Sequence, residues 1–151
     1  MNIEQLSDAC GGLAWISEQM MLQQRRLALA EARLETIDVL DDHTKALLAR
    51  SSRLFAQHEG WWRNLLPDSP ALKGSKRVGP PTQEWANTFN RLNSTAPNKA
   101  VETLYGEVLA ALVELIKGLL EQVSPISDEA FARVARMALV DLATEQAVKN
   151  S

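Results

Sequence analysis

Few side chains in this sequence could carry out chemistry. There are two histidines, His43 and His58, and one cysteine, Cys10. Structural zinc sites use about four histidine or cysteine ligands at close spacing, and the sequence has no such cluster. Cys10 precedes two glycines and lacks the basic neighbours that activate a thiol. We therefore expect it to pack as a small apolar residue.

Acidic residues give the pattern closest to a metal site. Glu31, Glu35, Asp38 and Asp42 recur at steps of four, three and four, which places them on one side of a helix, with His43 beside the last. Di-metal sites in bundles use inward carboxylates, but they also need Glu-x-x-His pairs on facing helices, and we find none. We expect a solvated acidic stripe. A metal-dependent bundle enzyme is the third of three functional hypotheses.

His58 and Glu59 are adjacent, and a carboxylate can orient a histidine that acts as a general base. Adjacency alone is no signature, and a histidine near a helix end commonly interacts with the last carbonyls. The segment GSKRVG lacks the Lys-Ser/Thr and the preceding strand of a phosphate-binding loop. The sequence thus predicts a protein that is not an enzyme and holds no cofactor.

A basic cluster lies in the segment KGSKR. Lys73, Lys76 and Arg77 stand out in a chain whose formal net charge is -3. Nearby tryptophans could stack on nucleic-acid bases, yet three charges are few for a protein that depends on phosphate contacts. We expect a linker here. A nucleic-acid-associated helical protein that uses residues 73–77 is the second hypothesis.

The elements that must position these side chains are helices, because helical spacing runs through almost the whole sequence and no stretch alternates as a strand would. The predicted fold class is all-α, a bundle of about five helices. Residues 1–66 form an N-terminal helical hairpin or coiled coil. Residues 67–81 form a Pro/Gly-rich basic linker, and residues 82–151 form a C-terminal helical part that shares one core with the first.

An apolar seam predicts how the N-terminal helix packs. Between residues 6 and 37 the seam recurs at alternating steps of three and four, and only Gln23 in it is polar. Such heptads pair two helices in a coiled coil, so the seam predicts a homodimer with interface residues Met20, Gln23, Leu27 and Leu34. The alternative is that the same seam packs inside one chain.

The length of this helix is a second open question. Residues 13–59 contain neither glycine nor proline, and one helix over this range would span about 70 Å, more than the roughly 38 Å diameter of a compact domain of this length. We favour a turn near DVLDDHTK, with Asp41 or Asp42 capping a second helix. Gly11 and Gly12 are expected to separate a short first helix from the rest.

Trp61 and Trp62 are candidates either for the core or for a docking surface. Helix neighbours are about 100° apart, so the two rings point in different directions, and each lies one turn before a leucine. Together they make one broad apolar face, which favours the core interpretation. Tryptophan is also enriched at interface hot spots, so both residues remain interaction candidates.

Three helices are predicted after the linker. Thr82 can cap a short one, and Ser127 can cap the last, with Ile126 and Phe131 as a hydrophobic staple. Between them, residues 99–123 form a helix that is apolar almost all round apart from glutamates every seventh residue, at 107, 114 and 121. Such a helix belongs at the centre of a bundle.

The function we expect is a non-enzymatic protein-protein interaction module, a regulator or adaptor that acts as a homodimer. Its protein partner cannot be named from the sequence. The net charge gives no field that would draw the chain to nucleic acid or to a membrane, and the charges within residues 104–123 argue against a membrane span. A single cysteine and the lack of a secretory signal predict a cytoplasmic protein. The abundance of Ala, Leu and Arg fits a bacterial or phage origin.

Overall fold

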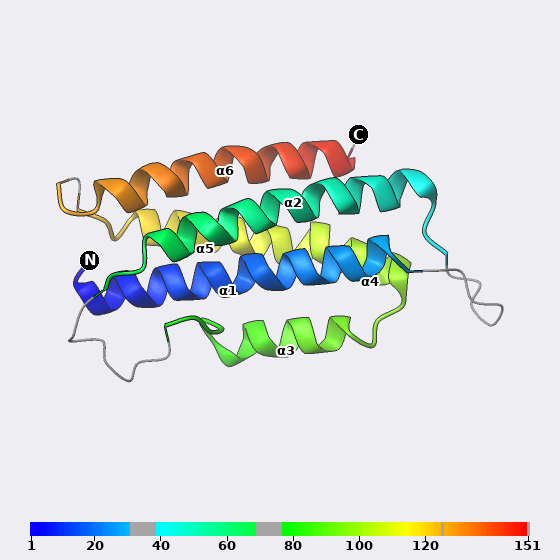
Figure 1. Ribbon diagram of the computed structural model, residues 1–151, viewed down its shortest axis with the longest axis horizontal. Helices are drawn as coiled ribbons and strands as arrows, with labels where there is room; N and C mark the ends of the chain where they lie inside the picture. Colours follow the sequence, from blue (N-terminus) through cyan, green and yellow to red (C-terminus); the bar gives the residue numbers. More distant parts are fainter. Residues whose placement is uncertain (31–38, 69–76, 125, 151) are drawn as a thin grey trace.

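The computed structural model describes residues 1–30, 39–68, 77–124 and 126–150, and in these ranges the chain is helical and contains no strand. In chain order the elements are α1 (Ile3–Ala28), α2 (Asp42–Asn64), α3 (Gln83–Leu92), α4 (Pro97–Thr103), the π-helical segment η2 (Leu104–Val108), α5 (Leu109–Leu120) and α6 (Glu129–Asn150). They pack lengthwise as a bundle, with α6 along one edge and α3 along the opposite edge (Figure 1). The predicted all-α bundle is confirmed, whereas a coiled coil is not.

The N-terminal part is a hairpin of two antiparallel helices (Figure 1). α1 ends at Ala28 and α2 begins at Asp42, so residues 13–59 do not form one helix. The side chain of Asp41 accepts a hydrogen bond from the backbone N–H of Thr44 at 2.7 Å, which confirms the predicted cap. Most of the predicted acidic stripe, as well as Leu34, falls within residues 31–38, outside the described part of the chain.

The apolar seam of α1 packs within its own chain, mainly against α2. The seam residues that are buried in the single chain are Ala9, Leu13, Ile16, Met20, Gln23 and Leu27. Gln23 is tolerated among them because its amide donates to Asn93 at 2.7 Å and accepts from the guanidinium of Arg26. The seam therefore packs inside one chain, which is the alternative to pairing two chains.

The glycine pair does not interrupt α1, so the prediction of a separate short helix is wrong. Both glycines are buried under residues 77–81. A Cβ at Gly11 would collide with the carbonyl group of Arg77, and one at Gly12 would lie 2.7 Å from the Cγ of Pro81. The pair lowers the intrinsic stability of the helix, but it lets the end of the linker lie directly on the helix backbone.

The buried side chains form one continuous cluster with members from both sides of the linker. Trp62 is 1% exposed and packs against Phe131 of α6, with 5.7 Å between ring centroids. The core interpretation of Trp62 is therefore confirmed. Trp61, one position earlier, is half-buried and stacks on His58.

α4, η2 and α5 form one uninterrupted helix with a π-helical turn in the middle. One row of buried residues recurs at steps of four: Ala100, Leu104, Val108, Leu112 and Ile116. On a regular α-helix each such step would rotate the side chain by about 40°. The π-helical turn takes up part of this drift because it holds more residues per turn, so both ends of the helix present apolar side chains to the same core.

α5 is less enclosed than its sequence predicts. Leu109, Leu112 and Ile116 are buried, but Leu115 and Leu119 are only partly covered. The expected place at the centre of the bundle is therefore wrong for one side of this helix. No helix in the described ranges is both long enough and apolar enough to cross a lipid bilayer.

α6 begins at Glu129, and its first hydrogen bond runs from the N–H of Ala132 to the carbonyl of Asp128. The cap position is thus one residue later than predicted. The hydrophobic staple is also wrong, because Ile126 is 91% exposed whereas Phe131 is buried. The turn is held instead by polar contacts, including a hydrogen bond of 2.7 Å from the N–H of Ser124 to the Asp128 carboxylate.

Candidate functional site

The one cysteine is not a nucleophile in this fold. Cys10 is completely buried in α1, and burial raises the pKa of its thiol to about 12. The thiolate is the reactive form of cysteine. The prediction that Cys10 packs as a small apolar residue is confirmed.

His58 lies within α2, not at its end, and its partner is not a backbone carbonyl, so that prediction is wrong. Its Nε2 lies 2.8 Å from Oδ2 of Asp141 on α6, and its ring stacks on Trp61. Burial lowers the pKa of His58, although the Asp141 carboxylate opposes this effect. Glu59, the sequence neighbour, forms an ion pair with Arg63 instead. The histidine is 1% exposed, so it ties α2 to α6 and faces no open cleft.

A buried polar cluster, not foreseen from the sequence, lies deeper between the helices. The amide of Gln24 donates to Ser51 Oγ at 2.7 Å and to the Tyr105 hydroxyl at 3.3 Å, and its own oxygen has no hydrogen-bond partner. Glu145 of α6 lies nearby and is paired with Arg50 at 3.8 Å. The hollow beside these side chains has no room for a water-sized molecule. The cluster therefore has the polar groups of a site but no space for a ligand.

Metal ligands do not gather in the part of the chain that is described. No group of three or more His, Cys, Asp or Glu side chains there could hold an ion. Of the predicted acidic stripe, only Asp42 and the neighbouring His43 are described, and both are exposed.

Open space among the described residues lies in part beside α3. This helix is anchored to α1: Phe89 packs edge-on against Trp15 at 5.5 Å between ring centroids, and the guanidinium of Arg26 donates to the carbonyl of Leu92 at 3.1 Å. Thr82 caps the helix as predicted, accepting from the N–H of Trp85. While α3 rests on α1 through Phe89 and Leu92, Thr88 and Arg91 on an adjoining side of the helix border a groove shared with α5.

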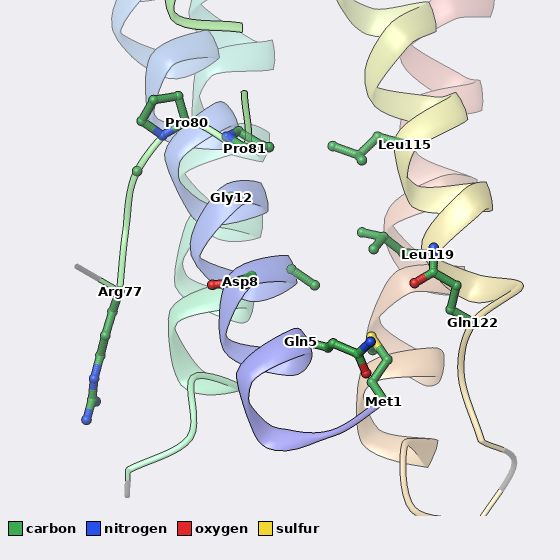
Figure 2. Close-up of a pocket in the computed structure, with 12 residues that line it drawn as sticks. Met1, Gln5, Asp8, Gly12, Arg77, Pro80, Pro81, Leu115, Leu119 and Gln122 are labelled. Carbon is green, nitrogen blue, oxygen red and sulfur yellow. The ribbon is translucent and has the colours of Figure 1, made fainter. Parts of the chain in front are cut away.

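One end of the groove is a hollow of about 530 Å³ between α1, residues 77–81 and α5. Figure 2 shows Leu115 and Leu119 pointing from α5 into this space, with Pro81 on the opposite wall. Gln5 and Gln122 lie near its lower end, where α1 and the turn after α5 each supply one amide. This end is therefore apolar inside, with amides and the charged residues Asp8 and Arg77 at its margin.

The middle of the groove is a second hollow of about 550 Å³ between α3 and α5, which shares Leu115 with the first. Its apolar lining consists of Trp85, Val108, Ala111 and Leu115. Its acidic lining consists of Glu84, Glu107 and Glu114. Arg91 is the one basic residue in this lining, so the middle of the groove carries a net negative charge.

A third, smaller hollow of about 220 Å³ continues the groove towards α4. It shares Thr88, Arg91 and Glu107 with the middle hollow and ends at Lys99. The three hollows therefore follow one another along the helix that runs from Pro97 to Leu120. Glu107 and Glu114, two of the three glutamates with seven-residue spacing, line this groove. Their spacing therefore marks the rim of a groove and not a helix at the centre of the bundle.

The predicted interaction residues are not brought together into one surface. Met20, Gln23 and Leu27 are buried in α1, and Trp62 is buried in α2. Trp61 is half-buried on the α2 side, away from the groove. Lys73 and Lys76 lie outside the described residues, as does Leu34. Arg77 is half-buried at the first hollow, where its side chain extends away from the α5 wall (Figure 2).

Comparisons with protein-family models, with curated proteins and with solved structures find no match to this chain. The fold and the site define an all-helical bundle with an open, acidic groove on one side.

Proposed function

We propose that the protein is a non-enzymatic interaction module, an adaptor or regulator that binds a helical segment of a polypeptide in the groove along α5. The observation that carries this proposal is the chain of three connected hollows with apolar side chains inside and charged side chains at the rim. An amphipathic helix binds such a groove by inserting side chains at helical spacing.

The placement of the reactive groups supports a binding role over a catalytic one. His58 and Cys10 are buried and line none of the three hollows. The buried polar cluster around Gln24 has no room for a substrate. A general base or nucleophile must come within hydrogen-bond reach of the reacting atoms, which neither group does in any open space among the described residues.

The sign of the charge in the groove favours a polypeptide over nucleic acid as the ligand. Glu84, Glu107 and Glu114 would repel phosphate groups, which supply most of the affinity of nucleic-acid-binding proteins. The nucleic-acid hypothesis depended on the basic residues in 73–77. Of these, Arg77 lies in the described part of the chain, and it forms an ion pair with Asp68 at 3.6 Å.

Site-specific photo-crosslinking in living cells tests the proposal. A photoreactive phenylalanine analogue at Ala111, which is exposed and lines the middle hollow, should give a defined polypeptide adduct. The same analogue at Ala46, exposed on α2 outside the groove, is the matched control. Adding Leu119→Arg should reduce the Ala111 adduct. If Ala111 gives no adduct beyond those seen at Ala46, the groove is not a polypeptide-binding site and the proposal is wrong.

A further inference from the structure

The outer face of α6 carries two exposed large apolar side chains. Met137 and Val140 lie less than one turn apart on it and are 44% and 68% exposed. The inner face of the same helix is buried through Phe131, Ala135 and Leu142. A helix that is apolar on two sides is normally covered on both. The other exposed large apolar residues lie singly on α1 or in turns, so α6 carries the one such pair among the described residues.

The charged side chains of α6 make its outer face basic. Arg133 and Arg136 are exposed there and form no ion pair with another described residue. The acidic residues in the middle of α6 point inwards instead, since Asp141 contacts His58 and Glu145 contacts Arg50. Glu129 is exposed only at the start of the helix.

The groove is complementary to this face in both chemistry and charge. Its middle hollow has an apolar lining that could receive Met137 and Val140, and glutamates at its rim could pair with the two arginines. Opposed patches of this kind raise the rate of association and fix the register of an interface. Helical spacing of apolar anchors is also what the groove requires.

We propose that α6 of a second copy of this chain occupies the groove. The inference rests on the proposed function of the groove and names its occupant. α6 and α3 lie at opposite edges of the bundle (Figure 1), so the two complementary surfaces of one molecule face away from each other. The contact is therefore head-to-tail: each bound pair keeps one free groove and one free α6. Contacts of this type build rings or open chains of subunits.

Two variants separate the two halves of the contact. The helix variant, Arg133→Glu with Arg136→Glu, keeps the groove but makes the outer face of α6 acidic. The groove variant, Ala111→Arg, keeps α6 but places a bulky cation on the groove lining. All three substituted positions are exposed, so unchanged circular dichroism and melting temperature serve as the control for folding.

Sedimentation velocity over a range of concentrations provides the measurement. The unmodified chain should form species larger than a dimer as its concentration rises, and each variant alone should associate at least about tenfold more weakly. An equimolar mixture of the two variants should stop at a 1:1 dimer, because only one intact α6 and one intact groove can meet. Added salt should weaken the contact, since its charges lie at an exposed rim.

Exchanging the charges on both surfaces distinguishes a lost contact from a destabilised fold, because only a lost contact can be restored by opposite charges. Combining the helix variant with Glu107→Arg and Glu114→Arg in one chain should restore self-association.

Three results would overturn the inference. The first is an unmodified chain that remains monomeric at all concentrations, and the second is a groove variant that associates as well as the unmodified chain. The third is a photo-crosslink from Ala111 to a polypeptide other than this chain, together with a monomeric unmodified chain. This result would overturn the inference about α6 but would leave the proposed function standing. A total lack of adducts would remove the proposed function as well, so the two failures are distinguishable.

Discussion

Replacing Gly11 with alanine sets two opposing effects against each other. Alanine is more favourable than glycine in a helix interior by about 1 kcal/mol. At Gly11, however, the new Cβ would overlap the carbonyl group of Arg77, which belongs to the backbone and cannot rotate away. Gly60 of α2 is the matched reference, because no atom beyond its chain neighbours and the adjacent helix backbone lies within 4 Å of the position of its Cβ. Both substitutions add the same methyl group to the same kind of element.

The size of the effect follows from comparing the two sites. Gly60→Ala should raise the free energy of unfolding by about 1 kcal/mol. Gly11→Ala should gain the same amount and lose about 1 to 3 kcal/mol from overpacking. The difference between the two variants is therefore the overpacking cost alone. For a chain of this size, it corresponds to melting temperatures that differ by roughly 2 to 12 °C, with Gly60→Ala the more stable.

Thermal denaturation followed by circular dichroism measures this difference, and trypsin provides a local readout. Displacing residues 77–81 from α1 should speed cleavage after Arg77 in the Gly11→Ala protein, whereas Gly60→Ala should leave the cleavage rate unchanged. Equal stabilisation by the two substitutions would refute the close packing of the linker end on α1. It would also remove one wall of the first hollow of the groove.

Other substitutions test the interior. Because burial lowers the pKa of His58, the unfolded chain binds a proton at higher pH than the folded chain does, and stability should fall as the pH drops below about 6.5. Urea midpoints measured between about pH 8 and about pH 5 should show this loss, which His58→Gln should diminish and the substitution of exposed His43 by alanine should not. Trp62→Ala should cost about 3 to 5 kcal/mol in thermal unfolding because the ring is fully buried, and half-buried Trp61→Ala should cost less; equal losses would contradict this placement. Gln24→Met should lower the urea-derived free energy of unfolding by about 1 to 3 kcal/mol, because it removes the hydrogen bonds to the buried Ser51 and Tyr105 hydroxyls; an unchanged stability would contradict the hydrogen bonding of this cluster.

Features that depend on neighbours in the sequence were predictable. Asp41 and Thr82 cap helices as expected, because a cap needs only the side chain and the backbone N–H three residues on. The all-α fold was predictable for the same reason, since helical periodicity depends on residues three and four positions apart. The cap of α6 was missed by one residue, because Asp128 rather than Ser127 takes the cap position before Glu129.

Features that depend on distant contacts were not predictable. The glycine pair was interpreted as a break because its partner, the segment at residues 77–81, lies far along the chain. His58 was assigned to a helix end, whereas its contact with Asp141 spans 83 positions. The groove exists because α3 packs on α1 and not on α5, a choice that the amphipathic pattern of either helix leaves open.

The π-helical turn joins the interior of the protein to its outer rim. Within these five residues, Tyr105 reaches inwards to Gln24, while Glu107 and Val108 line the groove. Shortening the turn by one residue to a regular α-helix would rotate α4 relative to α5 by about 100°. The acidic rim and the buried hydroxyl could then no longer both keep their places, so the extra residue sets the alignment between the groove proposed to bind a partner and the core that supports it.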